Sequence, residues 1–203
     1  MRLILASTSP RRKQILADAG FTFECADPGA AEDQVFAAPT PAALAVEKAR
    51  AKARSAAKTL RDSFPAIVIG ADTLVSLNGE VLGKPLDRND AKGILSRLSG
   101  TRHEVISGLC ICPALAPGPD TALPPPWITA VSTWVTMRTM TPDEIAAYVA
   151  SGESDGKAGA YAIQERGDRF VLRVDGSFAN VAGFPIEAFR EALPRLLNEW
   201  QIS

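Results

Sequence analysis

Short apolar runs rich in β-branched residues alternate along this chain with segments of helical periodicity. That alternation is typical of an α/β fold, in which helices flank a sheet. We expect strands at 3–5, 66–71, 102–112, 127–138 and 170–174. We expect helices at 10–19, 40–60, 87–98, 142–150 and 185–200. The pattern therefore predicts a sheet covered by helices.

Turn and breaker residues refine this prediction. Asn78-Gly79 predicts a hairpin after the second strand, because this pair suits the tight turns that join antiparallel strands. Segment 113–126 contains six prolines and can be neither helix nor central strand, so we expect an exposed loop. Residues 27–40 also predict a loop, and Pro194 predicts a kink in the last helix.

Composition excludes several classes of protein. The 203 residues suit one domain or two tightly joined lobes. With 22 basic and 23 acidic residues the net charge is -1, which argues against holding nucleic acid by bulk charge. No apolar run reaches the ~18 residues of a membrane span. Three cysteines and one histidine predict neither a disulfide framework nor a common zinc site, and a reducing cytoplasm is the expected setting.

The start of the first helix has an unusual charge. Thr141-Pro142-Asp143-Glu144 is an ordinary start, because its acids face the positive end of the helix dipole. Ser9-Pro10-Arg11-Arg12 has the same cap and proline, but places two cations there. A bound phosphate would offset that repulsion. The alternative is that the arginines point to solvent or meet acids elsewhere.

Asp72 ends an apolar strand, where α/β sheets place functional groups. If the hairpin loop has two residues, Thr73 faces Lys84 and the hairpin gathers an acid, a hydroxyl and an ammonium group. The acid could hold Mg²⁺ or accept a proton from water, and the lysine could neutralise phosphate oxygens. A surface salt bridge of little consequence is the alternative.

The long helix carries six basic residues and no acid among them. One face, with Arg50, Arg54, Lys58 and Arg61, predicts a solvated surface. Lys48 lies on another face with Lys52 and is our better ligand candidate. Glu32-Asp33 is either a metal ligand or ordinary loop polarity.

Three further segments bear on the site. Segment 157–164 is small and apolar, so it could lie against a flat base read by the amide of Gln164, or form a buried strand. His103 has no nucleophile or acid partner in its pattern and predicts a structural role. Cys110 and Cys112 point to one face of a strand, most simply the core.

Taken together, these segments resemble the Maf family of nucleoside triphosphate pyrophosphatases. The resemblance spans essentially the whole chain, and its motifs occur in the family order. They are Ser7-Thr8-Ser9-Pro10-Arg11-Arg12, Glu47-Lys48-Ala49, Gly70-Ala71-Asp72-Thr73, Gly83-Lys84-Pro85, Ser99-Gly100, the run 157–164 and GSxxNVxGxP at 176–185.

The resemblance implies one domain over 1–203, with a mixed sheet flanked by helices and two lobes around a deep central cleft, similar to inosine triphosphate pyrophosphatases. It implies cleavage of a nucleoside triphosphate between the α and β phosphates with Mg²⁺ or Mn²⁺. Asp72 would be the proton acceptor and, with Glu32, a metal ligand. Phosphate binding would fall to Ser9, Arg12, Lys48 and Lys84.

At the family's specificity positions this chain has Arg11, Thr73 and Gln164, which resemble the branch that acts on dTTP and UTP. Phe178 in place of a usual tyrosine, Glu165-Arg166 after the glutamine, and the long proline-rich segment depart from the family pattern. The alternatives are a 7-methyl-GTP pyrophosphatase, another phosphoryl-transfer enzyme, and a non-catalytic nucleotide-binding regulator of cell division. A homodimer is a family expectation.

Overall fold

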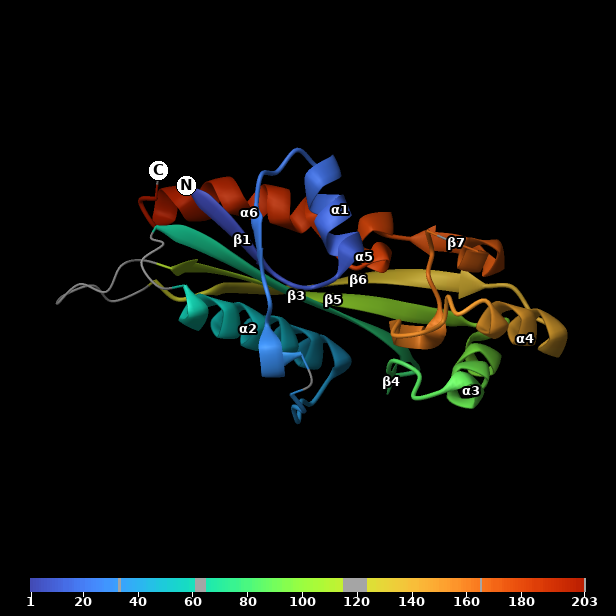
Figure 1. The fold of residues 1–203 in the computed structure, drawn as a ribbon. Coiled ribbons are helices and arrows are strands. Elements are labelled where there is room, and N and C mark those ends of the chain that lie inside the picture. Colours follow the sequence, from blue (N-terminus) through green and yellow to red (C-terminus); the bar gives the residue numbers. More distant parts are fainter. Residues whose placement is uncertain (33, 61–64, 115–123, 165, 203) are drawn as a thin grey trace. The chain divides into compact units, whose positions relative to one another are not determined.

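The computed structural model describes residues 1–32, 34–60, 65–114, 124–164 and 166–202 (Figure 1). Parallel and antiparallel pairs build a mixed seven-stranded sheet in the order β2-β1-β3-β5-β6-β7, with β4 paired to β3. The strands are β1 (Arg2–Ala6), β2 (Glu24–Ala26), β3 (Ala66–Leu77), β4 (Glu80–Leu82), β5 (Arg102–Ala114), β6 (Trp127–Met137) and β7 (Val171–Asp175). The α-helices are α1 (Pro10–Asp18), α2 (Pro41–Thr59), α3 (Arg88–Leu98), α4 (Pro142–Ala150), α5 (Phe178–Ala182) and α6 (Ile186–Glu199). The 3-10 helices are η1 (Gly29–Ala31), η2 (Ala158–Ala160) and η3 (Arg166–Phe170).

The chain divides into two compact units. Unit 1 comprises Met1–Asp72, Ser107–Val131 and Gly183–Ser203, and unit 2 comprises Thr73–Ile106 and Ser132–Ala182. Strands β3, β5 and β6 each contribute residues to both units.

In unit 1, α2 packs closely against the sheet because both surfaces are made of small residues. Its buried face is a row of alanines that meets Ile4, Val68 and Cys110. A Cβ at Gly70 would lie 2.1 Å from the Ala49 carbonyl oxygen. A Cβ at Gly108 would lie 2.1 Å from the Ala45 carbonyl oxygen. Two glycines therefore set the close approach of helix to strands.

Helices α1 and α6 cover the other face of the unit 1 strands (Figure 1). Phe189 on α6 packs edge-to-face on Phe21, with ring centroids 5.0 Å apart, and on Phe184 at 5.7 Å. Arg190 donates to the Ala19 carbonyl at the end of α1 (2.9 Å). These contacts fix the orientation of α1, which carries the unusual arginine pair.

Unit 2 contains the β3–β4 hairpin, the first residues of β5 (102–106), the last residues of β6 (132–137) and the whole of β7. The Asn78-Gly79 turn sets the pairs Leu77–Glu80, Ser76–Val81 and Val75–Leu82, as predicted. The ladder ends there, so it does not extend to Thr73 and Lys84, contrary to our expectation that these two face each other in it. Pro85 and the exposed Gly83 follow the last pair and end the strand.

The main helices and strands are confirmed within a few residues. Thr40 caps α2 through Ala43 N–H, and Thr141 with Glu144 forms a full capping box on α4. The loop 27–40 contains η1, and β2, α5 and η3 were not predicted. Of the predicted proline-rich loop, 113–114 belong to β5, 124–126 are irregular, and 115–123 lie outside the described residues. No described helix is both long enough and apolar enough to cross a membrane.

Candidate functional site

Unit 1 contains an ion cluster centred on Lys52 of α2. The Lys52 side chain is 1% exposed, and its Nζ lies 2.6 Å from Asp72 Oδ1 and 2.7 Å from Glu32 Oε2. The two carboxylates are more accessible, at 13% for Asp72 and 30% for Glu32. Removing an ammonium group from water costs free energy, and its ion pairs with the two carboxylates must offset that cost. Both ion pairs are therefore needed to keep the Lys52 ammonium buried.

Three separate elements bring these groups together. Lys52 lies on the same side of α2 as the buried alanines, at i+3 from Ala49 and i−4 from Ala56. Asp72 follows Gly70 in β3, and the missing Cβ of that glycine lets α2 approach the strand. Glu32 directly follows η1, which packs on α2.

Arg12 lies beside this cluster and is itself buried. Its Nε donates to the Gly183 carbonyl (2.9 Å), and a second guanidinium nitrogen donates to Ser7 Oγ (3.3 Å). Burial lowers the pKa of Arg12, while the charges of Asp72 and Glu32 act to raise it. The charges of two acids therefore act on Arg12, and its hydrogen bonds go to structural partners.

The start of α1 matches its expected backbone but not its expected cap. Pro10 is in the first turn and no acid is present there. Ser9 makes no side-chain cap, and its N–H instead donates to Ser7 Oγ (3.2 Å). The Ser9 hydroxyl is thus not used by the helix, unlike that of Thr141 on α4. The strand–turn–helix segment keeps a positive start, which suits an anion.

The remaining unit 1 candidates lie outside the ion cluster. Arg11 on α1 and Lys48 on α2 are half-buried. We preferred Lys48 over Lys52 on the sequence, but the structure makes Lys52 the buried cation. The signal was present in the pattern, because Lys52 keeps helical spacing to Ala45, Ala49 and Ala56, all fully buried.

Glu32 and Asp72 could both hold a divalent ion. Their carboxylates converge on one ammonium, so they can reach one small volume. Among the described residues, no group of three or more His, Cys, Asp or Glu side chains is placed to hold a metal. The donor set therefore does not suit an all-protein cage, but it fits Mg²⁺, which is commonly bound by one or two carboxylates and substrate phosphates.

Unit 2 carries Thr73, Lys84 and Gln164. Lys84 and Gln164 are exposed and Thr73 is half-buried. The Gly159 N–H donates to the Gly83 carbonyl (3.1 Å), which places segment 157–164 beside the end of the hairpin. Residues 161–163 are buried but form no strand, so the loop alternative for this segment holds.

The polar interior of unit 2 is neutral. His103 Nε2 lies 2.8 Å from the Tyr161 hydroxyl, and burial lowers the His103 pKa to about 4. Asn180 donates to the Val105 carbonyl and to the Thr133 hydroxyl, both at 3.1 Å. His103 is thus a buried packing residue, as predicted, and Cys110 also lies in a core.

Comparison with known proteins gives consistent results. Residues 2–196 match the family described as Maf-like protein. The chain is 43% identical over 194 residues to a dTTP/UTP pyrophosphatase of Anaeromyxobacter sp. (strain Fw109-5), covering 96% of this chain and 89% of that protein. It is 42% identical over 196 residues to one of Aquifex aeolicus, covering 97% and 96%.

A solved structure, a nucleoside-triphosphatase / dITP/XTP pyrophosphatase from Mycobacterium abscessus, covers 75% of this chain and 95% of its own. It is 13% identical with a TM-score of 0.37, which does not establish a shared fold. The family match over 2–196 rests instead on nearly the full sequence, including every motif that builds the ion cluster. The chain therefore belongs to the Maf-like protein family.

Proposed function

We propose that this protein is a nucleoside triphosphate pyrophosphatase that hydrolyses dTTP and UTP to the nucleoside monophosphate and pyrophosphate. The buried Lys52 with its two carboxylates is the observation that carries the proposal. Nucleotide binding alone has no need of carboxylates held at a cation. The relatives named dTTP/UTP pyrophosphatase support the same activity and substrate class.

The charges of the ion cluster suggest how the substrate is accommodated. Arg12 and Lys52 balance Glu32 and Asp72, so the cluster has no excess positive charge for a triphosphate. Mg²⁺ or Mn²⁺ on the two carboxylates would neutralise the phosphates and polarise the bond that breaks. Arg11 and Lys48 would add positive charge from α1 and α2.

In the proposed reaction, Asp72 accepts a proton from the attacking water, and Lys52 holds that carboxylate in position. Ser9, Arg12, Lys48 and Lys84 bind phosphate oxygens. The unused Ser9 hydroxyl at the positive end of α1 supports its part in this.

Base recognition falls to Arg11, Thr73 and Gln164. The Gln164 amide can both donate and accept, which matches the N3–H and carbonyl edge of thymine or uracil. Its exposure in unit 2 leaves the amide accessible to a ligand.

A pyrophosphate-release assay over a nucleotide panel with Mg²⁺ tests the activity. We expect hydrolysis of dTTP and UTP, and a fall of at least ~100-fold in Asp72→Asn, the scale of lost general-base catalysis. Glu199→Gln, which changes an exposed carboxylate that forms an ion pair with Arg195, is the matched control and should keep full activity. An Asp72→Asn rate within a few-fold of wild type would remove Asp72 from the reaction.

Substrate choice has its own test. The triple variant Arg11→Trp, Thr73→Gln, Gln164→Glu should lose activity on dTTP and UTP and gain it on 7-methyl-GTP. An ionised glutamate only accepts hydrogen bonds, and tryptophan stacks a cationic base better than arginine does. Steady-state rates on the three nucleotides decide this. A wild type that prefers 7-methyl-GTP would contradict the specificity assignment and leave the reaction type intact.

The cytoplasmic location and the homodimer belong to this proposal as family expectations. Light scattering of the purified protein would test the dimer directly.

A further inference from the structure

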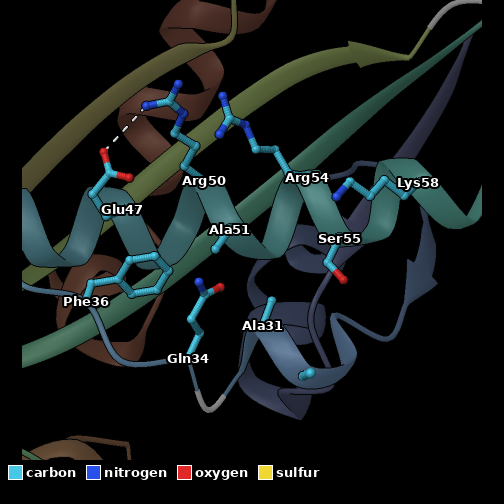
Figure 2. Close-up of a pocket in the computed structure, with 10 residues that line it drawn as sticks. Ala31, Gln34, Phe36, Glu47, Arg50, Ala51, Arg54, Ser55 and Lys58 are labelled. Atoms are coloured by element: carbon cyan, nitrogen blue, oxygen red, sulfur yellow. Dashed lines mark ion pairs between the residues drawn. The ribbon is translucent and has the colours of Figure 1, made fainter.

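Unit 1 contains a depression on the side of α2 that faces away from the alanine row. We call it the outer groove. It has a volume of about 620 Å³, and besides three alanines it is lined by Gln34, Phe36, Glu47, Arg50, Arg54, Ser55 and Lys58. Figure 2 shows Gln34 and Phe36 pointing toward α2 from the segment that follows η1. We predicted the basic residues of this face to be solvated surface. Arg54 and Lys58 are exposed, as predicted, and Arg50 is half-buried, while Arg61 lies outside the described residues.

The outer groove has more positive charge than the described residues offset. Glu47 lies 3.5 Å from Arg50, and this is the one ion pair among the lining residues. Within the described part of the chain, neither Arg54 nor Lys58 has an acid within ion-pair distance. The Arg50 Nε is buried with no hydrogen-bond partner in that same part.

Basic residues at regular helical spacing on α2 can contact successive phosphate groups of one ligand. Arg50, Arg54 and Lys58 follow at i, i+4 and i+8, so their Cα atoms rise along one face over roughly 12 Å. Phe36 supplies an aromatic face on the opposite wall, and the Gln34 amide can donate and accept there. The volume lies within the roughly 300–1,000 Å³ of small-molecule sites.

From these observations we propose that the outer groove is a second, non-catalytic binding site for a nucleotide. Its polyphosphate lies along Arg54 and Lys58 and its base lies against Phe36. A bound nucleic acid is disfavoured by the chain's net charge of -1. The site is separate from the ion cluster, since Lys52 and Arg54 project about 200° apart around α2.

The outer groove is also placed to influence the ion cluster. Gln34 and Phe36 follow Glu32 in the same segment, and Glu32 contacts Lys52. A ligand in the outer groove therefore contacts Gln34, two positions after Glu32 in the sequence. We expect occupancy of the outer groove to change the hydrolysis rate without any contact with the reacting phosphates.

Titration calorimetry with α,β-methylene-dUTP and Mg²⁺ tests the proposal, because this probe resists cleavage between the α and β phosphates. We expect two binding sites per wild-type chain and one in Arg54→Gln/Lys58→Gln, with the lost site weakened at least ~10-fold. The matched control is Arg88→Gln/Lys92→Gln, an exposed i, i+4 pair on α3, which should keep both sites.

Inorganic tripolyphosphate separates the phosphate contribution from the nucleoside. Phe36→Ala should weaken α,β-methylene-dUTP at the outer groove and leave tripolyphosphate binding there unchanged. One site in the wild type, or two in Arg54→Gln/Lys58→Gln, would overturn the proposal. So would binding of an oligonucleotide but not of α,β-methylene-dUTP at these residues. If Arg12→Ala instead leaves both sites unaffected, the proposed catalytic site fails and the outer groove stands.

Discussion

In unit 1 the buried polar side chains include two cations, Lys52 and Arg12, beside Ser7 and Ser107, whereas among the described residues of unit 2 the buried polar side chains are all neutral. Lys52 lies between Asp72 and Glu32, and Arg12 lies beside them. His103 meets a tyrosine hydroxyl, and Asn180 meets a carbonyl and a threonine. Buried neutral groups suit packing, although His103 Nδ1 has no hydrogen-bond partner among the described residues. Buried charges held around accessible carboxylates suit an ionic substrate.

Removing the central cation should have the largest effect on stability. Lys52→Met leaves two carboxylates facing each other without their partner, and we expect the free energy of unfolding to fall by about 3 kcal/mol. Urea unfolding measures this. Lys92→Met, at an exposed position of α3, should change it by no more than about 0.5 kcal/mol. Equal effects of the two substitutions would show that the cluster contributes nothing to folding.

Acid should act on unit 2 through His103. Its pKa is about 4 in the folded protein against 6.5 ordinarily, so the unfolded chain binds the proton first as pH falls. Stability is full above pH 6.5 and declines toward pH 4, with about 2–3 kcal/mol lost near pH 4.5. Urea unfolding at several pH values measures the slope.

The chain's single histidine allows a direct check on that slope. Its imidazole proton resonance should not titrate until below about pH 5. A midpoint near the ordinary value would place His103 in contact with water and contradict its neutral, packed environment.

Arg12 tests whether charges in unit 1 also serve structure. Arg12→Ala removes hydrogen bonds to Gly183 and Ser7 in a buried setting, so we expect a loss of about 1–2 kcal/mol. On the sequence alone, relief of the helix dipole predicts no loss. Arg11→Ala, at the neighbouring half-buried position, should cost less. Thermal unfolding without nucleotide compares them, and an unchanged Arg12→Ala would favour the dipole argument.

The two helix starts provide the smallest and most sensitive contrast. Thr141→Ala breaks a capping box and should cost about 1 kcal/mol. Ser9→Ala breaks no cap, so its effect on unfolding should be a few tenths of a kcal/mol at most, while nucleotide hydrolysis falls. If Ser9→Ala destabilises the protein as much as Thr141→Ala, the serine serves the helix and not a phosphate.

Local sequence signals predicted most of this fold. Thr40-Pro41 and Thr141-Pro142 mark helix starts because caps and first-turn prolines act through neighbouring atoms. The strand Glu24–Ala26 was missed because it is short, largely exposed and has no apolar pattern. The helix Phe178–Ala182 is too short for a period to show.

The site was predictable only in part, because burial depends on tertiary packing. Asp72 and Glu32 were identified, but the sequence gives no reason for both to meet one lysine 20 residues before Asp72. Lys52 keeps the helical spacing of the alanines in the sequence, but the strands packed on α2 decide that the alanine face is the covered one. Likewise, Arg54 and Lys58 gain a second wall only when the segment after η1 folds against them.

The glycine of Gly70-Ala71-Asp72 has a consequence beyond packing. Because a Cβ there would meet the Ala49 carbonyl, 2.1 Å away, and the Ala53 nitrogen, 2.8 Å away, this glycine fixes the separation of α2 from β3. Gly108 on β5 fixes the separation of α2 from that strand in the same way, one turn earlier in the helix at Ala45. Lys52 projects from the helix thus held, so the reach of its ammonium to Asp72 is set by residues that carry no functional group. The motif therefore supplies an acid and also sets the distance between α2 and β3. A methyl group added at Gly70 would separate Lys52 from Asp72 without contacting either side chain.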